Sequence, residues 1–248
     1  MCAQALAANG AKVYITGRRK DALENAVKSH HPNDFGGEII AASTCDVTSK
    51  DDLQKLAKEI ESKEKHLNLL VAAAGISGPK APPEERNAKD LKNKLWENET
   101  FEGWDKTWRT DVSGVYFSTV AFLPLLQAGT ESHGHLSASV IVISSMSGIM
   151  RDSQGHFAYN AAKGGTVHLT KLMSAEFLKI RVRVNSIAPG YFPSEMTAKE
   201  SGSDQKSHLP DEKIQEKGHV PHQRAGSDEE MAQAVVSSFE ILASNLAY

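Results

Sequence analysis

The feature that most constrains the fold is an alternation of short apolar runs and helical patterns along the 248-residue chain. Its clearest stretch starts with the apolar run 140–143, continues through the helical pattern 158–179 and ends in the apolar run 182–187. Short apolar runs bounded by turn residues are typical of buried strands, and strands that alternate with helices form parallel sheets. The sequence therefore predicts an α/β protein with a doubly wound parallel sheet, arranged as a single domain over residues 1–248.

The same patterns predict further elements on both sides of this stretch. We expect strands at 13–16, 39–43 and 67–73, and helices at 2–9, 20–29, 51–61, 104–126 and 228–243, with Ser49 as a cap. Segment 77–103 is rich in proline and charge, which favours a long loop with at most a short helix. Segment 195–223 is polar and suits a mobile flap.

Composition excludes several classes of protein. A formal net charge of −3 without a basic cluster argues against nucleic-acid binding. No apolar stretch is judged long enough to span a membrane, and the N-terminus lacks the pattern of a signal peptide, so we expect a cytoplasmic protein. Two cysteines make no disulfide framework, and the histidines lack the paired spacing of a metal site, so no metal is expected. The histidines weighed for that role are His156, His168, His208, His219 and His222.

Three polar side chains form the candidate catalytic group. Tyr159 and Lys163 stand four residues apart in a predicted helix and share one face, while Ser145 follows a predicted strand. A phenol, an ammonium and a hydroxyl around one point suit proton transfer to a carbonyl oxygen. An isolated pair of this kind is more simply a tyrosine stacked along a lysine stem. The succession of strand, loop, helix and strand around it favours the catalytic interpretation.

Six segments resemble the short-chain dehydrogenase/reductase family, in the family's order and at similar separations. They are Thr16–Arg19, Cys45–Val47, Ala72–Gly75, Ile143–Ser145, Tyr159–Lys163 and Pro189–Thr197. The resemblance implies a Rossmann-like fold and an oxidoreductase that transfers hydride between a nicotinamide cofactor and a small-molecule carbonyl or secondary alcohol. It also implies a homodimer or homotetramer that assembles through helices 104–126 and 158–179.

The resemblance assigns catalytic roles within this group. Tyr159 would be the general acid that protonates the carbonyl oxygen, or the base in the reverse direction. Lys163 would bond the nicotinamide ribose and lower the pKa of the phenol, whose ordinary value is about 10. Ser145 would donate a hydrogen bond to the substrate oxygen, with Ser147 as a weaker alternative and Ser144 facing away.

The resemblance also implies a choice of cofactor, which depends on the residues at the end of the second strand of the family fold. Members that use NAD have a carboxylate there, whereas this chain has Arg18 and Arg19. Two guanidinium groups suit a 2′-phosphate, so NADP(H) is expected ahead of NAD, with Arg18 ahead of Arg19. Two solvated arginines that open a helix are the alternative. Further implied cofactor contacts are Asp46 and Val47 near the adenine, Ala73, Gly75, Tyr159 and Lys163, and then Pro189, Gly190, Ser194 and Met196 near the nicotinamide.

The chain also departs from the family pattern. It has no Gly-x-x-x-Gly-x-Gly near its start, so we expect the fold to lack the usual first strand with its glycine-rich turn, and the usual last strand as well. Asp111 replaces the asparagine that holds a proton-relay water, and its charge would alter the titration of Tyr159. These departures leave an alternative open: a catalytically impaired fragment or a non-enzymatic relative that no longer binds dinucleotide. The substrate is not identified, although Trp96, Tyr191, Phe192 and Met196 suggest an apolar wall.

Overall fold

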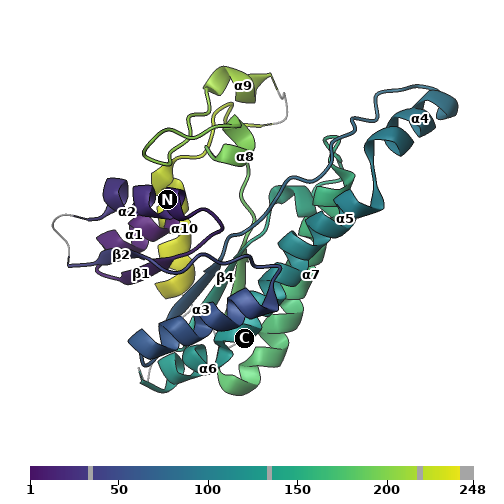
Figure 1. Cartoon of the computed structure of the whole chain (residues 1–248). Helices are drawn as coiled ribbons and strands as arrows, with labels where there is room; N and C mark the ends of the chain where they lie inside the picture. The colour runs from purple at the N-terminus through teal and green to yellow at the C-terminus, as the bar shows by residue number, and fades with distance from the viewer. Residues whose placement is uncertain (33–35, 133–135, 217–219, 241–248) are drawn as a thin grey trace. The chain divides into compact units, whose positions relative to one another are not determined.

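In the computed structural model, which describes residues 1–32, 36–132, 136–216 and 220–240, five strands form two parallel sheets (Figure 1). The first sheet has the order β1-β2 and the second the order β3-β4-β5. The predicted parallel α/β class is confirmed. The chain divides into two compact units, Met1–Asp46 with Lys58–Ile60 and Pro189–Tyr248 as unit 1, and Val47–Ala57 with Glu61–Ala188 as unit 2.

Unit 1 is built on the two-stranded sheet. β1 (Lys12–Ile15) pairs with β2 (Glu38–Ala41) in parallel. Helix α1 (Cys2–Ala8) contacts both strands and also α10 (Asp228–Glu240), and α2 (Lys20–His30) contacts β2. The predicted end of the first helix at residue 9 is confirmed, because Asn9 is the C-cap of α1 and Gly10 has the positive φ of 86° that stops a helix.

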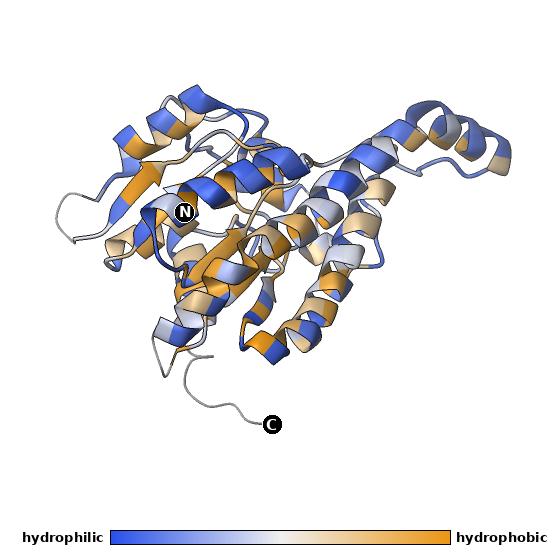
Figure 2. Ribbon diagram, turned by 60° about the horizontal axis from the view of Figure 1, so that its bottom comes forward, coloured by the Kyte–Doolittle hydropathy of each residue, from blue (hydrophilic) through white to orange (hydrophobic). Residues whose placement is uncertain are grey.

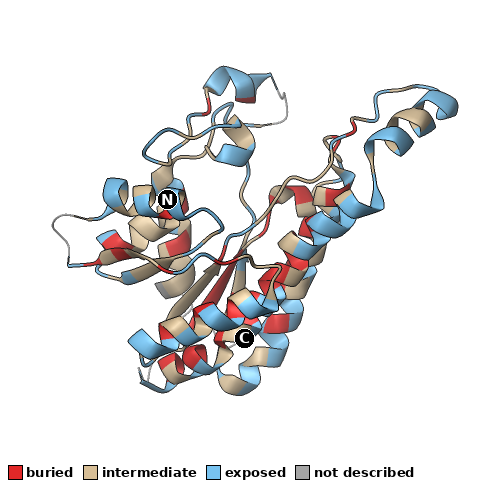
Figure 3. Ribbon diagram, in the orientation of Figure 1, coloured by how far each residue is buried: buried red, intermediate tan, exposed pale blue. Residues whose placement is uncertain are grey.

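Unit 2 is built on the three-stranded sheet, whose apolar strands are orange in Figure 2. β3 (Leu69–Ala72) and β5 (Arg183–Ile187) flank β4 (Ser139–Ile143), whose Val140, Ile141 and Val142 are fully buried. Helix α6 (Gly114–Ser132) packs on β3 and β4, and α7 (Phe157–Phe177) packs on β5. Figure 3 shows the buried residues on β4 and on these helices. Burial on both faces explains why β4 is an unbroken apolar run.

The remaining elements are mostly short. They are α3 (Lys50–Lys63), α4 (Ala88–Asn98), α5 (Phe101–Trp108), η1 (Arg109–Ser113), η2 (Met146–Gly148), η3 (Leu178–Ile180), α8 (Glu195–Ala198) and α9 (Asp211–Gln215). The predicted cap of α3 is confirmed, since the hydroxyl of Ser49 accepts the N–H of Asp52 at 3.2 Å. The predicted helix 228–243 is present as α10, and its residues 241–243 lie outside the described part.

Two expectations need correction in the segment 77–132. The predicted loop contains α4, an eleven-residue helix that begins where the side chain of Asn87 accepts the N–H of Asp90 at 3.0 Å. Its side chains are partly or fully exposed, so no buried apolar stripe marks it in the sequence. The predicted helix 104–126 is longer and consists of α5, a π-helical turn η1 and α6 in succession.

The continuous helical stretch Phe101–Ser132 bears on the expectation that no apolar stretch is long enough to span a membrane. It contains an 18-residue window of mean hydropathy 1.3, so by length and composition it could cross a bilayer. Half of that window is buried within the protein, and α6 packs on β3 and β4. A core helix that is covered on one side has the same composition as a membrane span, which is why hydropathy alone does not separate the two.

Candidate active site

The serine of the candidate site lies directly after β4. Ser144 turns away from it, because its hydroxyl donates to the carbonyl oxygen of Ile187 at 3.0 Å and accepts from Ser186 at 2.6 Å. Ser145 is the N-cap of η2, and its Oγ accepts the N–H of Ser147 at 3.1 Å. This bond leaves the hydroxyl proton of Ser145 available to a second partner. The alternation predicted for Ser144 and Ser145 is confirmed.

Helix α7 brings Tyr159 and Lys163 to the same place. The Nζ of Lys163 lies 5.7 Å from the centre of the Tyr159 ring, as expected for two residues on one helix face. The hydroxyl of Ser145 is near enough to the Tyr159 phenol for a hydrogen-bonding interaction to lower the pKa of the phenol. Lys163 is only 4% exposed, and its ammonium donates to the carbonyl oxygen of Ile143 at 3.1 Å. The three predicted side chains therefore meet within unit 2.

A glycine contact holds η2 against α7. A Cβ atom on Gly148 would lie 2.5 Å from the carbonyl carbon of Lys163 and 2.7 Å from the nitrogen of Gly164. Real Cβ atoms do not approach backbone so closely, so only glycine allows this packing. The contact sets how near the turn that begins at Ser145 can lie to the helix that carries Lys163.

Asp111 is enclosed by the same elements. It lies on the π-helical turn η1, and its side chain is fully buried. Its Oδ1 accepts the N–H of Ile76 at 2.8 Å, while its buried Oδ2 has no hydrogen-bond partner among the described residues. A Cβ atom placed on Gly75 would be 3.1 Å from Asp111 Oδ1 and 3.4 Å from Lys163 Nζ. The carboxyl and the ammonium thus face one point, where a side chain on Gly75 would require them to shift by a few tenths of an ångström.

Burial dominates the electrostatics of these groups. It raises the pKa of Asp111 to about 6, although the charge of Lys163 and the N–H of Ile76 oppose the shift. It lowers the pKa of Lys163, which Asp111 partly restores. It also raises the pKa of Tyr159, against the hydrogen bond of Ser145 and with the negative charge of Asp111.

The expectation that Lys163 makes the phenol more acidic is therefore wrong for this structure. Loss of water around the tyrosine costs the phenolate more than the local hydrogen bond returns. Lys163 is not among the groups that shift the pKa of Tyr159. The phenol is protonated at neutral pH, as its ordinary pKa of about 10 already requires.

The predicted cofactor residues fall on both units. Val47, Ala73 and Gly75 belong to unit 2, as do Tyr159 and Lys163. Arg18, Arg19, Asp46, Pro189, Gly190, Ser194 and Met196 belong to unit 1. Ala73 is exposed beyond the end of β3, and Val47 packs against Gly114, where a Cβ would lie 2.9 Å from its Cγ2.

The two arginines of unit 1 differ in their surroundings. Arg18 is exposed, and its side chain has no bonded partner within the described ranges. Arg19 donates two hydrogen bonds to the carboxylate of Glu195, from Nη1 to Oε1 at 3.0 Å and from Nη2 to Oε2 at 2.6 Å. No sequence pattern indicates Glu195 as this partner, because it lies 176 residues from Arg19 along the chain.

Ser194 has a structural role that its sequence neighbours could have indicated. Its side chain accepts the N–H of Thr197 at 3.3 Å, and the Thr197 side chain accepts the N–H of Ser194 at 3.0 Å. This reciprocal capping box starts α8, and a serine three residues before a threonine is compatible with it. Met196 is 44% exposed in the same helix.

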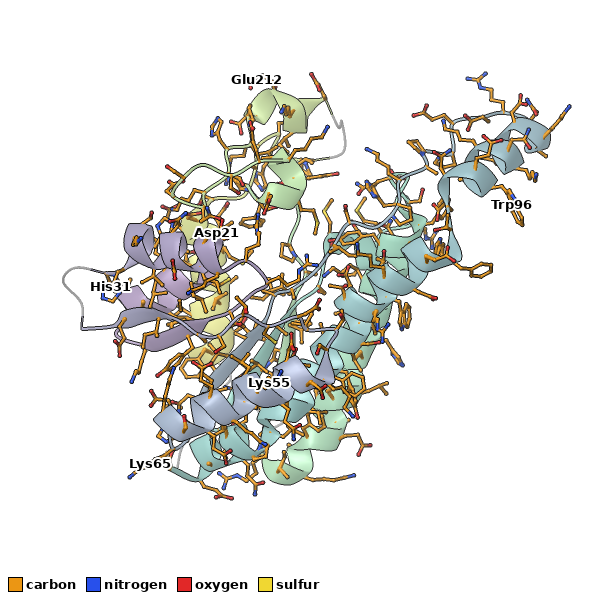
Figure 4. All side chains as sticks on the ribbon, viewed as in Figure 1. Asp21, His31, Lys55, Lys65, Trp96 and Glu212 are labelled. Atoms are coloured by element: carbon orange, nitrogen blue, oxygen red, sulfur yellow. The ribbon has the colours of Figure 1, made fainter. Side chains whose placement is uncertain are left out.

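The remaining predicted residues are less informative. Trp96 extends from α4 into solvent, 76% exposed, so it lines no pocket in unit 2 (Figure 4). The ring of His156 lies edge-on to that of Tyr159, with centres 6.5 Å apart. Over the described part of the chain, which excludes His219, no three His, Cys, Asp or Glu side chains form a group able to hold a metal ion.

Comparison with known proteins gives consistent matches. The family model described as short chain dehydrogenase matches residues 1–205. The short-chain dehydrogenase/reductase PhomF of Diaporthe leptostromiformis is 39% identical over 202 residues, which are 80% of this chain and 67% of that protein. The short-chain dehydrogenase/reductase SAT3 of Stachybotrys chartarum is 31% identical over 249 residues, covering 94% of this chain and 89% of that protein.

Solved structures resemble the fold over nearly its whole length. The RhlG/NADP active-site complex of Pseudomonas aeruginosa has a TM-score of 0.78 at 26% identity and covers 98% of this chain and 85% of that one. A short-chain type dehydrogenase/reductase from Mycobacterium marinum has a TM-score of 0.77 at 25% identity, covering 98% of this chain and 84% of that one.

Proposed function

Because the chain belongs to the short-chain dehydrogenase family of oxidoreductases, we propose that it transfers hydride between NADP(H) and a small-molecule carbonyl or secondary alcohol. The observation that carries this proposal is the meeting of Ser145, Tyr159 and Lys163 within unit 2. The cofactor supplies the hydride, and the protein supplies a proton and a polar site for the substrate oxygen.

Tyr159 is assigned the role of acid in carbonyl reduction. The phenol carries its proton at neutral pH and gives it up as negative charge develops on the substrate oxygen. Ser145 holds that oxygen through its hydroxyl, whose own Oγ is fixed by the N–H of Ser147.

Lys163 and Asp111 act on the phenol through their charges. Lys163 is held on the Tyr159 face of α7 by the carbonyl of Ile143, so its charge is available to stabilise negative charge as the proton leaves. Asp111 is the fourth catalytic candidate, because its state of protonation changes the charge felt by both Lys163 and Tyr159. A neutral carboxyl leaves the phenol easier to ionise than a carboxylate does.

The turn that carries Arg18 and Arg19 in unit 1, here called the arginine turn, supports NADP(H) over NAD. Arg18 is exposed and its guanidinium is available to a phosphate group, which it can bind with two parallel hydrogen bonds. The Pseudomonas aeruginosa relative is described as an NADP complex, which agrees with this choice. We assign the remaining contacts to Asp46, Val47, Ala73 and Gly75 on the adenosine side and to Pro189, Gly190, Ser194 and Met196 on the nicotinamide side.

The cofactor proposal is tested by titrating NADPH and NADH into the whole chain and following their fluorescence. We expect NADPH to bind more tightly, and Arg18→Ala to weaken NADPH by about tenfold while leaving NADH unchanged. Lys28→Ala is the matched control, because it removes an exposed positive charge from α2 of the same unit. Equal affinities of the two cofactors for the native chain would contradict the choice of NADP(H).

A second candidate function is a non-catalytic relative that binds no dinucleotide. The raised pKa of Tyr159 and the pairing of Arg19 with Glu195 favour it, since both groups are less available than the activity would require. Absence of saturable binding by either cofactor would leave only this candidate. Binding followed by carbonyl-dependent oxidation of NADPH would exclude it.

We further propose that the chain acts as one domain over residues 1–248, is cytoplasmic, and forms a homodimer or homotetramer. Helices α5, α6 and α7 support the assembly, because they expose apolar side chains that a subunit interface would bury. These side chains are Trp104, Trp108, Phe117, Val120 and Leu172. Sedimentation of the purified chain tests the assembly, and a monomer at micromolar concentration would contradict it.

A further inference from the structure

The ion pair between Arg19 and Glu195 in unit 1 has no part in the catalytic and cofactor-binding roles proposed above. Both terminal nitrogens of the guanidinium donate, and each carboxylate oxygen accepts one N–H, at 3.0 and 2.6 Å. This is the fork geometry in which arginine also binds a phosphate. The carboxylate of Glu195 therefore occupies one of the donor pairs of Arg19 that a phosphate could use, and places a negative charge beside the others.

The two residues come from elements of different kinds. Arg19 is the N-cap of α2, in the turn that follows β1, and Glu195 is the first residue of the four-residue helix α8. Two further amides of α8 bond to Ser194, and the amide of Lys199 bonds to Glu195 itself. The ion pair thus links α8 to the arginine turn, although the two residues lie far apart in the sequence.

The ion pair has two well-directed hydrogen bonds, but its solvent exposure allows another anion to replace the carboxylate. Its side chains are 60% and 51% exposed, so water and salt reduce its net stability. The hydrogen bonds and charge of Glu195 raise the pKa of Arg19, and those of Arg19 lower the pKa of Glu195, so both groups stay charged at neutral pH. A dianionic phosphate is a better partner for guanidinium than an exposed carboxylate, and the two anions repel each other at one guanidinium.

We infer that Glu195 is a cofactor-specificity residue: its carboxylate competes with a 2′-phosphate for Arg19, and binding of that phosphate detaches α8 from the arginine turn. The inference rests on the proposed use of NADP(H). A cofactor without a 2′-phosphate leaves the ion pair intact and α8 fastened. Arg18 provides the first contact with the phosphate, and Arg19 joins it only after it has released Glu195.

Calorimetry with two small probes tests the competition directly. Adenosine 2′,5′-bisphosphate carries the 2′-phosphate, and adenosine 5′-monophosphate lacks it; both are measured at one ionic strength. We expect Glu195→Gln to tighten the bisphosphate about two- to fivefold, the range that an exposed ion pair is worth, and to leave the monophosphate unchanged. Glu212→Gln is the control, because Glu212 is an exposed residue of α9 in the same unit, labelled in Figure 4.

The outcomes separate this inference from the function on which it depends. If the native chain prefers the bisphosphate but Glu195→Gln behaves like Glu212→Gln, the competition is refuted and the NADP(H) proposal stands. If the native chain does not distinguish the probes, the NADP(H) proposal fails and the competition fails with it. Equal tightening of both probes by Glu195→Gln would also refute a role specific to the 2′-phosphate.

Hydrogen exchange gives a second readout that does not depend on affinity. The amides of Thr197, Ala198 and Lys199 are hydrogen-bonded within α8 and report its attachment. In the native chain, we expect the bisphosphate to speed their exchange several-fold, whereas the monophosphate should not. In Glu195→Gln, exchange should be fast without any probe. Slow exchange in this variant, or no effect of the bisphosphate on the native chain, would overturn the inference.

Discussion

The ammonium of Lys163 and the carbonyl oxygen of Ile143 are joined by a hydrogen bond of 3.1 Å. Ile143 is the last residue of β4, and Ser145 lies two residues beyond it. The bond therefore fixes the distance between the strand end that carries Ser145 and the helix that carries Tyr159. Lys163 is a positioning group for these residues as well as a source of positive charge.

Lys163 should contribute a rise of stability with pH in the alkaline range, and Lys163→Met should remove this contribution. Burial lowers the pKa of Lys163 below its ordinary 10.5. Between the lowered value and 10.5 the unfolded chain binds more protons at this group than the folded one, so the free energy of unfolding increases with pH. Urea denaturation across the alkaline range measures the slope. Lys171→Met, an exposed substitution on α7, should keep the native slope, and equal slopes in all three proteins would contradict the prediction.

Asp111→Asn should stabilise the protein at neutral pH. The pKa of Asp111 is raised from 3.8 to about 6, so the folded state holds a proton that the unfolded state releases between these values. The free energy of unfolding therefore falls as pH rises through this window, by up to about 3 kcal/mol. Denaturation between pH 4 and pH 7 should show this fall in the native chain and a smaller one in Asp111→Asn. Asp105→Asn, on the exposed side of α5, is the control.

Tyr159→Phe should reduce the rate of carbonyl reduction by about 10²- to 10⁴-fold, because it removes the proton donor and leaves the ring in place. The affinity for NADPH, measured by fluorescence, should stay close to native. Tyr116→Phe removes a phenol from an exposed position on α6 and should leave the rate unchanged. A rate for Tyr159→Phe within tenfold of the native rate would mean that another group donates the proton.

Gly148→Ala should destabilise the protein by about 1–3 kcal/mol and lower activity, because its methyl group would push η2 away from the backbone of Lys163. Gly164→Ala changes the other side of the same contact, where the new Cβ would meet only the oxygen of Gly148, at 3.4 Å. That variant should be no less stable than the native chain, since alanine favours a helix over glycine. Thermal denaturation of the two variants measures the difference.

Local patterns were sufficient to predict most elements and the central group of the site. The spacing of Tyr159 and Lys163 placed them on one helix face, and strand alternation predicted the opposite directions of Ser144 and Ser145. These predictions succeed because each depends on the geometry of a single element. Helix α4 was underestimated for the corresponding reason, since it buries no side chain that would give it an apolar stripe.

Properties that depend on tertiary packing were not predictable in the same way. The spacing of Tyr159 and Lys163 suggested a phenol with a lowered pKa, whereas burial by surrounding elements raises the pKa above its ordinary value. The pairing of Arg19 with Glu195 joins residues 176 positions apart, and no local pattern connects them. Burial and long-range pairing are properties of the folded chain as a whole, and a single sequence reports them only indirectly.

The π-helical turn at Arg109–Ser113 gives the long helix 101–132 a place where one residue can be removed without rotating the rest. A π turn takes up one residue more than an α turn for the same rotation about the axis. Excision of one residue here would let the helix relax to regular winding and would leave the side chains beyond it on their present faces. Leu125 and Leu126 would then stay interior. Excision of one residue from the regular part of α6 would instead rotate every later side chain by about 100°.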